Sequence, residues 1–400
     1  MTLLTIDEPH PSAPTKMTLD KHPLFRLGFR PFYLLAAAFA AIAVPLWLAR
    51  YFGLLPALSH IDLNWHVHEM VFGFAIAVIV GFLFTAGRNW SGLWTPRGRY
   101  LAALAALWLA GRLAMLLLPP AIAAVIDAAF LPLAAWPLYV VLKKSGNRRN
   151  LFLVGLLGLL TLLNLSYHAA ANGWATWSAL TPLHGAILVI VLIESLIAGR
   201  VVPGFTANAV PGVKPLTDDR RDKLMLGLTG LTCLAWIVGF PPALLAALAL
   251  ATAAAQLLRL AGWKTYRTLA NPLLWILHVS YAWIPVGFVL LGLAALGKTS
   301  ASAAFHVLTV GSMAGLIIGM MTRTALGHTG RPLKAGRAET LMYLLVQVGV
   351  VARLWAAIGP LDGRNIALTL AASVWSAAFL LYLLVYAPYL WRARVDGREG

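Results

Sequence analysis

Histidine is the residue type whose placement in this chain most directly implies chemistry. Seven of the ten histidines lie inside or at the ends of strongly apolar segments: His66, His68, His168, His184, His278, His306 and His328. An imidazole surrounded by lipid needs a hydrogen-bond partner, water or a metal, because an unsatisfied polar group is costly there. Imidazole is also a common ligand of transition metals and of haem iron. These residues indicate a membrane protein that binds metal, with haem as one candidate.

The composition defines the elements that must position these histidines. The chain is 60% hydrophobic and 11% charged, with a mean hydropathy of +0.80, whereas soluble domains are roughly 45–50% apolar and about 25% charged. Apolar runs recur from about Pro31 to about Leu390, each long enough to span a bilayer as a helix. The sequence predicts an all-α polytopic membrane protein with about twelve transmembrane helices, near 32–50, 66–86, 100–118, 121–142, 150–170, 178–199, 223–240, 242–260, 272–296, 302–322, 340–358 and 365–390.

The net charge of +17 is explained by membrane topology, and we expect no nucleic-acid partner. Most of the Lys and Arg residues fall in alternate loops, which is the pattern of loops retained in the cytoplasm. Both termini are therefore predicted to be cytoplasmic. We expect a cytoplasmic N-terminal segment (1–30), a single transmembrane domain (31–392) and a cytoplasmic tail (393–400). A cytoplasmic loop at about 200–223 divides the transmembrane domain into two six-helix halves.

Cys233 is the only cysteine. A disulfide framework, an iron–sulfur cluster within the chain and a covalently attached c-type haem are therefore excluded. Any haem must be non-covalent and bound through histidine.

The expected topology gives each histidine a depth. His66, His68, His168, His184 and His306 fall near the outer face, on four helices. His278 lies one or two turns from the cytoplasmic end of its helix, and His328 lies just beyond a helix on the cytoplasmic side. Residues i and i+2 of a regular helix point about 200° apart. His66 and His68 are therefore expected to face different ways unless the segment is extended.

Several other side chains could serve such a site. Glu69 and Glu194 are the acidic residues most suited to burial, and each could be a ligand, orient an imidazole or carry a proton. Tyr281, three residues after His278, could form a plain hydrogen-bond pair with it. Arg353 could bind a haem propionate or extend to the interface, and Arg112 with Asp127 is expected to join two helices. Four methionines could be soft copper ligands but suit packing better: Met70, Met313, Met320 and Met321.

Several separate motifs carry a resemblance to a known family. They are Pro23-Leu-Phe-Arg-Leu-Gly-Phe-Arg-Pro-Phe32, Trp65-His-Val-His-Glu-Met70, Gly81-Phe-Leu-Phe-Thr-Ala86 with Asn89-Trp90, Gly199-Arg-Val-Val-Pro203 with Phe205-Thr206 and Asn208, His306-Val-Leu-Thr-Val-Gly311, Met320-Met-Thr-Arg323 and Leu326-Gly-His-Thr-Gly-Arg331. In this order they resemble the NnrS family across essentially the whole chain. The chain departs from the family pattern at Ala198, Gly204 and Gly87-Arg88, which bears on the cytoplasmic loop more than on the metals.

The resemblance implies a bacterial inner-membrane protein that contains haem b and copper and is linked to nitric oxide metabolism, denitrification and nitrosative stress. The matching motifs imply that His66, His68, His306 and His328 bind metal or cofactor, as in the family. The resemblance carries over His184 and His278 less directly, and Arg200 and Arg323 as motif arginines without an assigned role.

The leading hypothesis is a histidine-bound b-type haem that binds nitric oxide and reduces or transfers it. Reduction would make the protein an oxidoreductase resembling nitric oxide reductases, supplied with electrons by quinol or a redox protein, with Glu69, Glu194 and Tyr281 as catalytic candidates. One alternative is a scavenger or sensor that binds nitric oxide without turnover. A second is a secondary transporter, which twelve helices and a central loop also suit. Haem–copper oxidases share only the architecture, because this chain lacks their adjacent histidine pair.

Overall fold

The fold is a bundle of long helices. The computed structural model describes residues 18–399, and these residues form helices and no β-strand, which confirms the all-α prediction. The helices are α1 (Phe29–Tyr51), α2 (Leu63–His68), α3 (Ile76–Ser91), α4 (Gly98–Leu117), α5 (Pro120–Lys144), α6 (Arg148–Ala171), α7 (Leu180–Ala209), α8 (Asp219–Val238), α9 (Pro242–Gly262), α10 (Pro272–Ala295), α11 (Ala301–His306), α12 (Gly315–His328), α13 (Arg337–Ile358) and α14 (Arg364–Trp391). Two π-helical segments, η2 (Glu69–Ala75) and η4 (Val307–Ala314), make α2–α3 and α11–α12 continuous.

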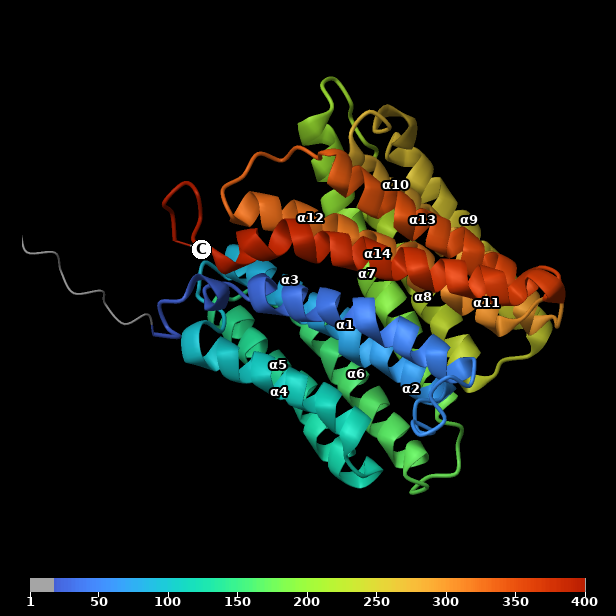
Figure 1. The fold of residues 1–400 in the computed structure, drawn as a ribbon. Helices are drawn as coiled ribbons and strands as arrows, with labels where there is room; N and C mark the ends of the chain where they lie inside the picture. The colour runs from blue at the N-terminus through green and yellow to red at the C-terminus, as the bar shows by residue number, and fades with distance from the viewer. Residues whose placement is uncertain (1–17, 400) are drawn as a thin grey trace, which may run out of the picture.

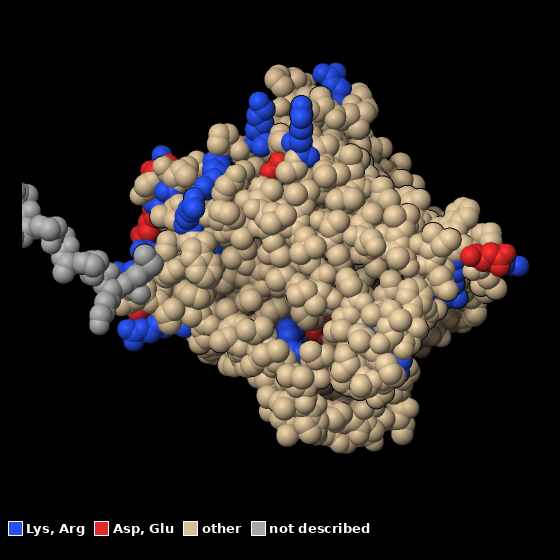
Figure 2. Space-filling view, in the orientation of Figure 1, with Lys and Arg blue, Asp and Glu red and all other residues tan. Residues whose placement is uncertain are grey.

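The bundle is that of a multi-pass membrane protein. Among the described residues, 11 helices are long and apolar enough to cross a membrane. The remaining long helix is α8, whose first turn is charged throughout, from Asp219 to Lys223. Figure 2 shows that Lys and Arg gather toward the end where the C-terminus lies and toward the loops at the top, while a broad middle belt is almost free of charge. The orientation of the bundle across the membrane stays a prediction.

The elements are arranged around α7. The first half packs α4, α5 and α6 side by side, and the second half packs α8, α9 and α10, with α7 contacting α6, α8 and α10. Helix α14 lies along α1 and α13, so the end of the chain closes the bundle against its beginning (Figure 1). Figure 1 also places α2 and α11 at the same end of the bundle.

The two π-helical segments are the least regular feature of the fold. Each begins directly after a motif histidine, His68 in one case and His306 in the other. The helices that precede them, α2 and α11, each begin with a side-chain cap. The Asp62 side chain accepts a hydrogen bond from the Trp65 backbone amide at 2.8 Å, and the Ser300 side chain accepts one from the Ala303 amide at 3.3 Å. Single π-turns recur at functional sites in helical proteins, and here they follow the histidines of two separate helices.

Two helix ends differ from the sequence-based expectation. Helix α7 continues to Ala209, so Arg200 and Pro203 are helical and the loop before α8 is shorter than predicted. Helix α12 continues to His328, which is its last residue and not a loop residue. Both extensions run through polar motif residues, whose apolar neighbours pack into the bundle and sustain the helix.

The predicted terminal segments are only partly described. Residues 1–17 of the expected N-terminal segment lie outside the described residues, as does residue 400. The tail is tied to the end of α12, because Arg394 Nη1 donates to the His328 carbonyl at 2.9 Å and the Val395 amide donates to the Thr329 carbonyl at 3.2 Å.

Candidate functional site

A cavity of about 340 Å³ lies where α1, α2, α7, α11, α13 and α14 meet. Three histidines from three separate helices line it: His66, His184 and His306. The rest of the lining is almost entirely apolar and includes Trp47, Phe74, Phe305 and Trp375. Cofactor sites are typically apolar cavities of roughly 300–1,000 Å³ with a few polar groups, and this cavity matches that description.

Each of the three imidazoles has its own support. His66 stacks on the indole of Trp47, with ring centroids 4.2 Å apart. His184 stacks almost parallel on Phe305, with centroids 4.0 Å apart. His306 uses Nδ1 to donate to the Ser302 carbonyl at 2.7 Å. A proton fixed on Nδ1 leaves Nε2 of His306 with a free lone pair, as a metal-binding imidazole requires.

His66 has an unsatisfied nitrogen. Its Nδ1 is buried, and no described residue offers it a hydrogen bond. Buried polar atoms in native proteins are nearly always paired, so an unpaired one calls for a specific explanation. A ligand in the cavity would provide it.

Arg353 supplies the only cationic side chain among the cavity-lining residues of the described chain. Its Nη2 donates to Ser302 Oγ at 3.2 Å, so the guanidinium lies beside the residue that orients His306. Met70 and Met313 also line the cavity. Three imidazoles, one guanidinium, two thioethers and the hydroxyls of Ser302 and Thr309 are therefore available to a ligand there.

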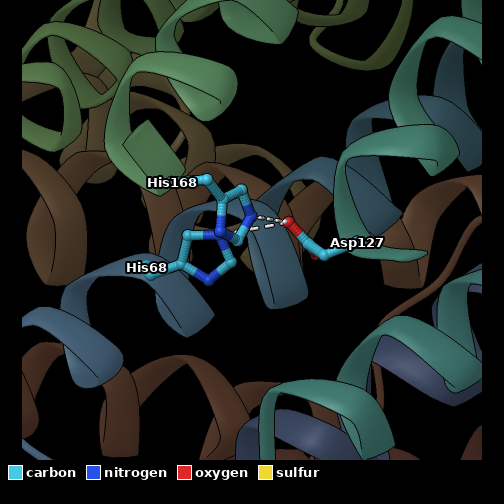
Figure 3. A group of neighbouring side chains, drawn as sticks. All are labelled: His68, Asp127 and His168. Carbon is cyan, nitrogen blue, oxygen red and sulfur yellow. Dashed lines mark hydrogen bonds and ion pairs between the residues drawn. The ribbon is translucent and has the colours of Figure 1, made fainter. Parts of the chain in front are cut away.

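His68, by contrast, lies in a second and fully buried polar cluster. His68, Asp127 and His168 come from α2, α5 and α6 and point toward one another (Figure 3). Asp127 Oδ2 lies 2.8 Å from His168 Nε2 and 3.3 Å from His68 Nε2. Asn164 Nδ2 donates to the same Asp127 oxygen at 2.8 Å. Within residues 18–399, it is the one group of three or more His, Cys, Asp or Glu side chains whose ligand atoms all lie within 4.8 Å of one another, close enough to share a metal ion.

Arg112 ties this cluster to the first residue of η2. It donates to Glu69 Oε1 at 2.7 Å and, from Nη2, to Asp127 Oδ1. The expected Arg112–Asp127 pair is thus present, and it belongs to a larger network. Gly73 makes room for it, because a Cβ there would lie 3.0 Å from Arg112 Nη1 and 3.1 Å from Glu69 Oε2.

His278 does not form the expected pair with Tyr281. Its Nε2 lies 2.9 Å from Thr206 Oγ1 and its Nδ1 lies 3.0 Å from Thr265 Oγ1, so both nitrogens are engaged. These threonines come from other elements, which spacing along one helix cannot reveal. Tyr281 instead donates to Gln256 Oε1 and accepts a hydrogen bond from Arg259 at 3.2 Å. Neither residue lines the histidine cavity.

Glu194 lies in a smaller cavity of about 80 Å³. It is a separate cavity, lined mainly by α3, α7 and α12. Helix α7 also lines the histidine cavity, and α3 and α12 are the continuations of α2 and α11, which line it too. Glu194 Oε2 accepts a hydrogen bond from Ser312 Oγ at 3.0 Å, and its buried Oε1 has no partner among the described residues. Its carboxyl is the acidic group of that otherwise apolar lining.

The remaining motif residues have structural contacts. The ring of His328 lies 5.7 Å from that of Phe29, away from both cavities. Arg200 donates to Asn150 Oδ1 at 2.8 Å, and the Arg323 guanidinium lies 3.9 Å from the centroid of Phe205. Gly199 leaves space for the Arg259 guanidinium, because a Cβ at position 199 would overlap that group.

Asp127, Asn164 and His168 are the site residues that the sequence did not single out together. A weak signal was present: Asn164 and His168 are four residues apart and share one face of α6. The sequence pairs Asp127 only with Arg112, because the packing of α5 against α6 cannot be predicted from a single helix.

The fold and the two histidine sites define a class: a polytopic helical membrane protein with buried, imidazole-rich sites suited to metals or a metal cofactor. The family model for the NnrS protein matches residues 23–394, nearly the whole chain. The chain belongs to the NnrS family, which links it to the nitric oxide response. A comparison with curated proteins finds no match to it.

Proposed function

We propose that this protein is a b-type haem protein of the bacterial inner membrane that binds nitric oxide at the histidine cavity and reduces it, with copper as a second metal. The observation that carries the proposal is the convergence of His66, His184 and His306 on one apolar cavity. Family membership supports the link to nitric oxide.

The cavity residues fit a haem. The unpaired Nδ1 of His66 and the free Nε2 of His306 are the kind of nitrogen donors that iron takes. The aromatic and aliphatic lining suits the faces of a porphyrin, and Arg353 suits a propionate. We propose that the iron ligands are among His66, His184 and His306, and that Arg353 binds a propionate.

Haem bound in this cavity would supply a redox-active site for nitric oxide. The chain's own residues supply the surroundings. Trp47 and Phe305 keep the imidazoles of His66 and His184 in place by stacking, and Ser302 keeps the His306 proton on Nδ1. The apolar lining excludes water and admits an apolar gas from the lipid.

Reduction of nitric oxide to nitrous oxide and water also consumes protons. We propose that Glu194 carries them toward the histidine cavity, because its partner-free carboxyl oxygen lies in the small cavity on α7, the helix that also carries His184. The electrons are proposed to come from quinol or a redox protein.

The test is to add nitric oxide to purified, haem-loaded protein and to record its disappearance with an electrode, with and without reduced quinol. The proposal predicts a shift of the haem absorption bands and loss of nitric oxide well beyond one equivalent when a donor is present. Loss limited to about one equivalent would indicate a scavenger or sensor and contradict the reductase. No spectral shift would contradict nitric oxide binding altogether.

A further inference from the structure

His68 is surrounded by oxygen atoms on both sides of its ring. Nδ1 lies 2.9 Å from Glu69 Oε1, while Nε2 lies 3.0 Å from Asn164 Oδ1 and 3.3 Å from Asp127 Oδ2. An ionised carboxylate only accepts hydrogen bonds. The Glu69 contact therefore places the His68 proton on Nδ1, and Nε2 then directs its lone pair at two further oxygens that have no proton to give.

Turning the Asn164 amide over does not relieve this conflict. Its Nδ2 already donates to Asp127 Oδ2 at 2.8 Å, and the turned amide would direct its oxygen at that carboxylate. His168 Nε2, 2.8 Å from the same oxygen, serves as a further donor to Asp127 and offers nothing to His68. The contacts between His68 Nε2, Asn164 Oδ1 and Asp127 Oδ2 therefore require a cation there, either a second proton on His68 or a metal ion.

The charge of the cluster leads to the same conclusion. Glu69 and Asp127 contribute two carboxylates, and Arg112 contributes the one guanidinium that pairs with them. The side chains of Glu69 and His68 are fully buried, and that of Asp127 is 2% exposed. An uncompensated negative charge is expensive at such a position, and a bound cation relieves it.

We propose that His68, His168 and Asp127 bind a borderline divalent cation, copper(II) or zinc(II), with Asn164 Oδ1 as a fourth ligand. Imidazole nitrogen with carboxylate oxygen is a donor set that these two ions favour. The three histidine and aspartate ligand atoms lie within 4.8 Å of one another, on three helices (Figure 3). Small shifts of these side chains are enough to enclose one ion.

The residues around these ligands orient them as the surroundings of metal sites in proteins usually do. Metal-binding histidines usually donate their second ring nitrogen to a carboxylate, which fixes the tautomer, and Glu69 accepts from His68 Nδ1 in this way. Arg112 binds the other oxygen of Asp127, Oδ1, and so leaves Oδ2 directed at the two imidazoles. Tyr167 stacks on His68 with centroids 4.4 Å apart and fixes the ring plane.

The inference rests on the proposed function in one respect, the presence of a second metal beside haem, and it gives that metal a site of its own. The haem cavity and the cation site share no ligand. Their failures are therefore distinguishable, because haem content reports on one and metal content on the other.

The experiment uses the full chain, purified in detergent, stripped with a chelator and titrated with Cu²⁺ or Zn²⁺ alone. Metal content is measured by mass spectrometry after removal of free ion. We expect one tightly bound ion per chain and nitrogen hyperfine coupling from two imidazoles in the Cu²⁺ spin-resonance spectrum. His168→Gln and Asp127→Asn remove direct ligands, and each should weaken binding by more than the roughly 10–100-fold typical of losing a supporting residue. His66→Ala is the matched control and should keep the ion.

Elution of each cluster variant as a single species, with unchanged haem content, shows that it has folded. For His66→Ala, which alters the haem cavity, elution as a single species is the criterion. Asn164→Asp adds a carboxylate without removing a ligand and should tighten binding, which a merely destabilised protein would not do. Equal affinity in Asp127→Asn and wild type would overturn the proposal. A Cu²⁺ spectrum that lacks coupling to two imidazole nitrogens would also overturn it. So would a chain that binds no ion, in which His68 is doubly protonated instead.

Discussion

The imidazoles of His66 and His68 belong to different sites although one residue separates them in the chain. His66 stacks on Trp47 beside the cavity, with centroids 4.2 Å apart, and His68 stacks on Tyr167 in the carboxylate cluster, with centroids 4.4 Å apart. The separation of about 200° between positions i and i+2 of a helix accounts for this. One short helix, α2, thereby serves two sites through opposite faces.

Arg112 is expected to be essential for stability. Arg112→Met leaves the Glu69 and Asp127 carboxylates buried without their partner, which should cost about 3–5 kcal/mol in the free energy of unfolding. Unfolding of metal-free protein in detergent, followed by circular dichroism, measures the loss. The triple variant with Glu69→Gln and Asp127→Asn removes the unpaired charges and should regain part of it. A stable Arg112→Met protein would show that the pairs matter little.

Gly199 is expected to tolerate no side chain. A Cβ at this position falls on the Arg259 guanidinium, which donates to the Ser195 carbonyl at 2.7 Å. Gly199→Ala should therefore cost about 1–3 kcal/mol by overpacking. Gly204→Ala, five residues along the same helix, is the control, because nothing lies within 4 Å of its added Cβ. It should be neutral or slightly stabilising. Similar unfolding midpoints for the two variants would refute the argument from close approach.

Arg353 is expected to contribute to haem affinity through a carboxylate. Arg353→Leu removes a charge-assisted hydrogen bond of about 1.5–3 kcal/mol, which corresponds to about 10–100-fold weaker binding of haem. Haem titration followed by absorption spectroscopy measures the change. Haem dimethyl ester, which has no free carboxylate, is the control ligand, and the variant should bind it as the wild type does. An equal loss for both ligands would show that Arg353 acts through packing alone.

Glu194 is expected to affect turnover and not haem binding. Glu194→Gln keeps the shape and the Ser312 hydrogen bond but removes the ionisable group. Proton delivery by a positioned side chain contributes about 10²–10⁴-fold to rates, so catalytic loss of nitric oxide should fall by at least about 10²-fold at unchanged haem content. Ser312→Ala is the milder companion variant. Unchanged turnover in Glu194→Gln would exclude a proton path through this carboxyl.

The sequence was sufficient for features that depend on one helix at a time. Apolar length predicted the spans except α8, which is expected near 223–240 but is not among the 11 helices long and apolar enough to cross a membrane. The expected depths grouped five histidines in one region, and the structure divides them: His66, His184 and His306 line the cavity, whereas His68 and His168 lie in the carboxylate cluster. Features that depend on contacts between helices were not predictable in this way. Asp127 meets His168 only because α5 packs on α6, and His278 bonds to Thr206 and Thr265, which belong to other elements. The π-helical segments after His68 and His306 leave no mark in the apolar pattern, because they add a residue to a turn without changing its polarity.

The haem content of the purified protein, measured as a pyridine haemochrome together with elemental analysis, tests the proposed haem cavity most directly. We expect b-type haem in the wild type and in His68→Ala, and strongly reduced haem in variants that replace His66, His184 or His306 with alanine. A colourless wild-type protein from haem-replete cells would contradict the account, as would haem that survives loss of all three cavity histidines.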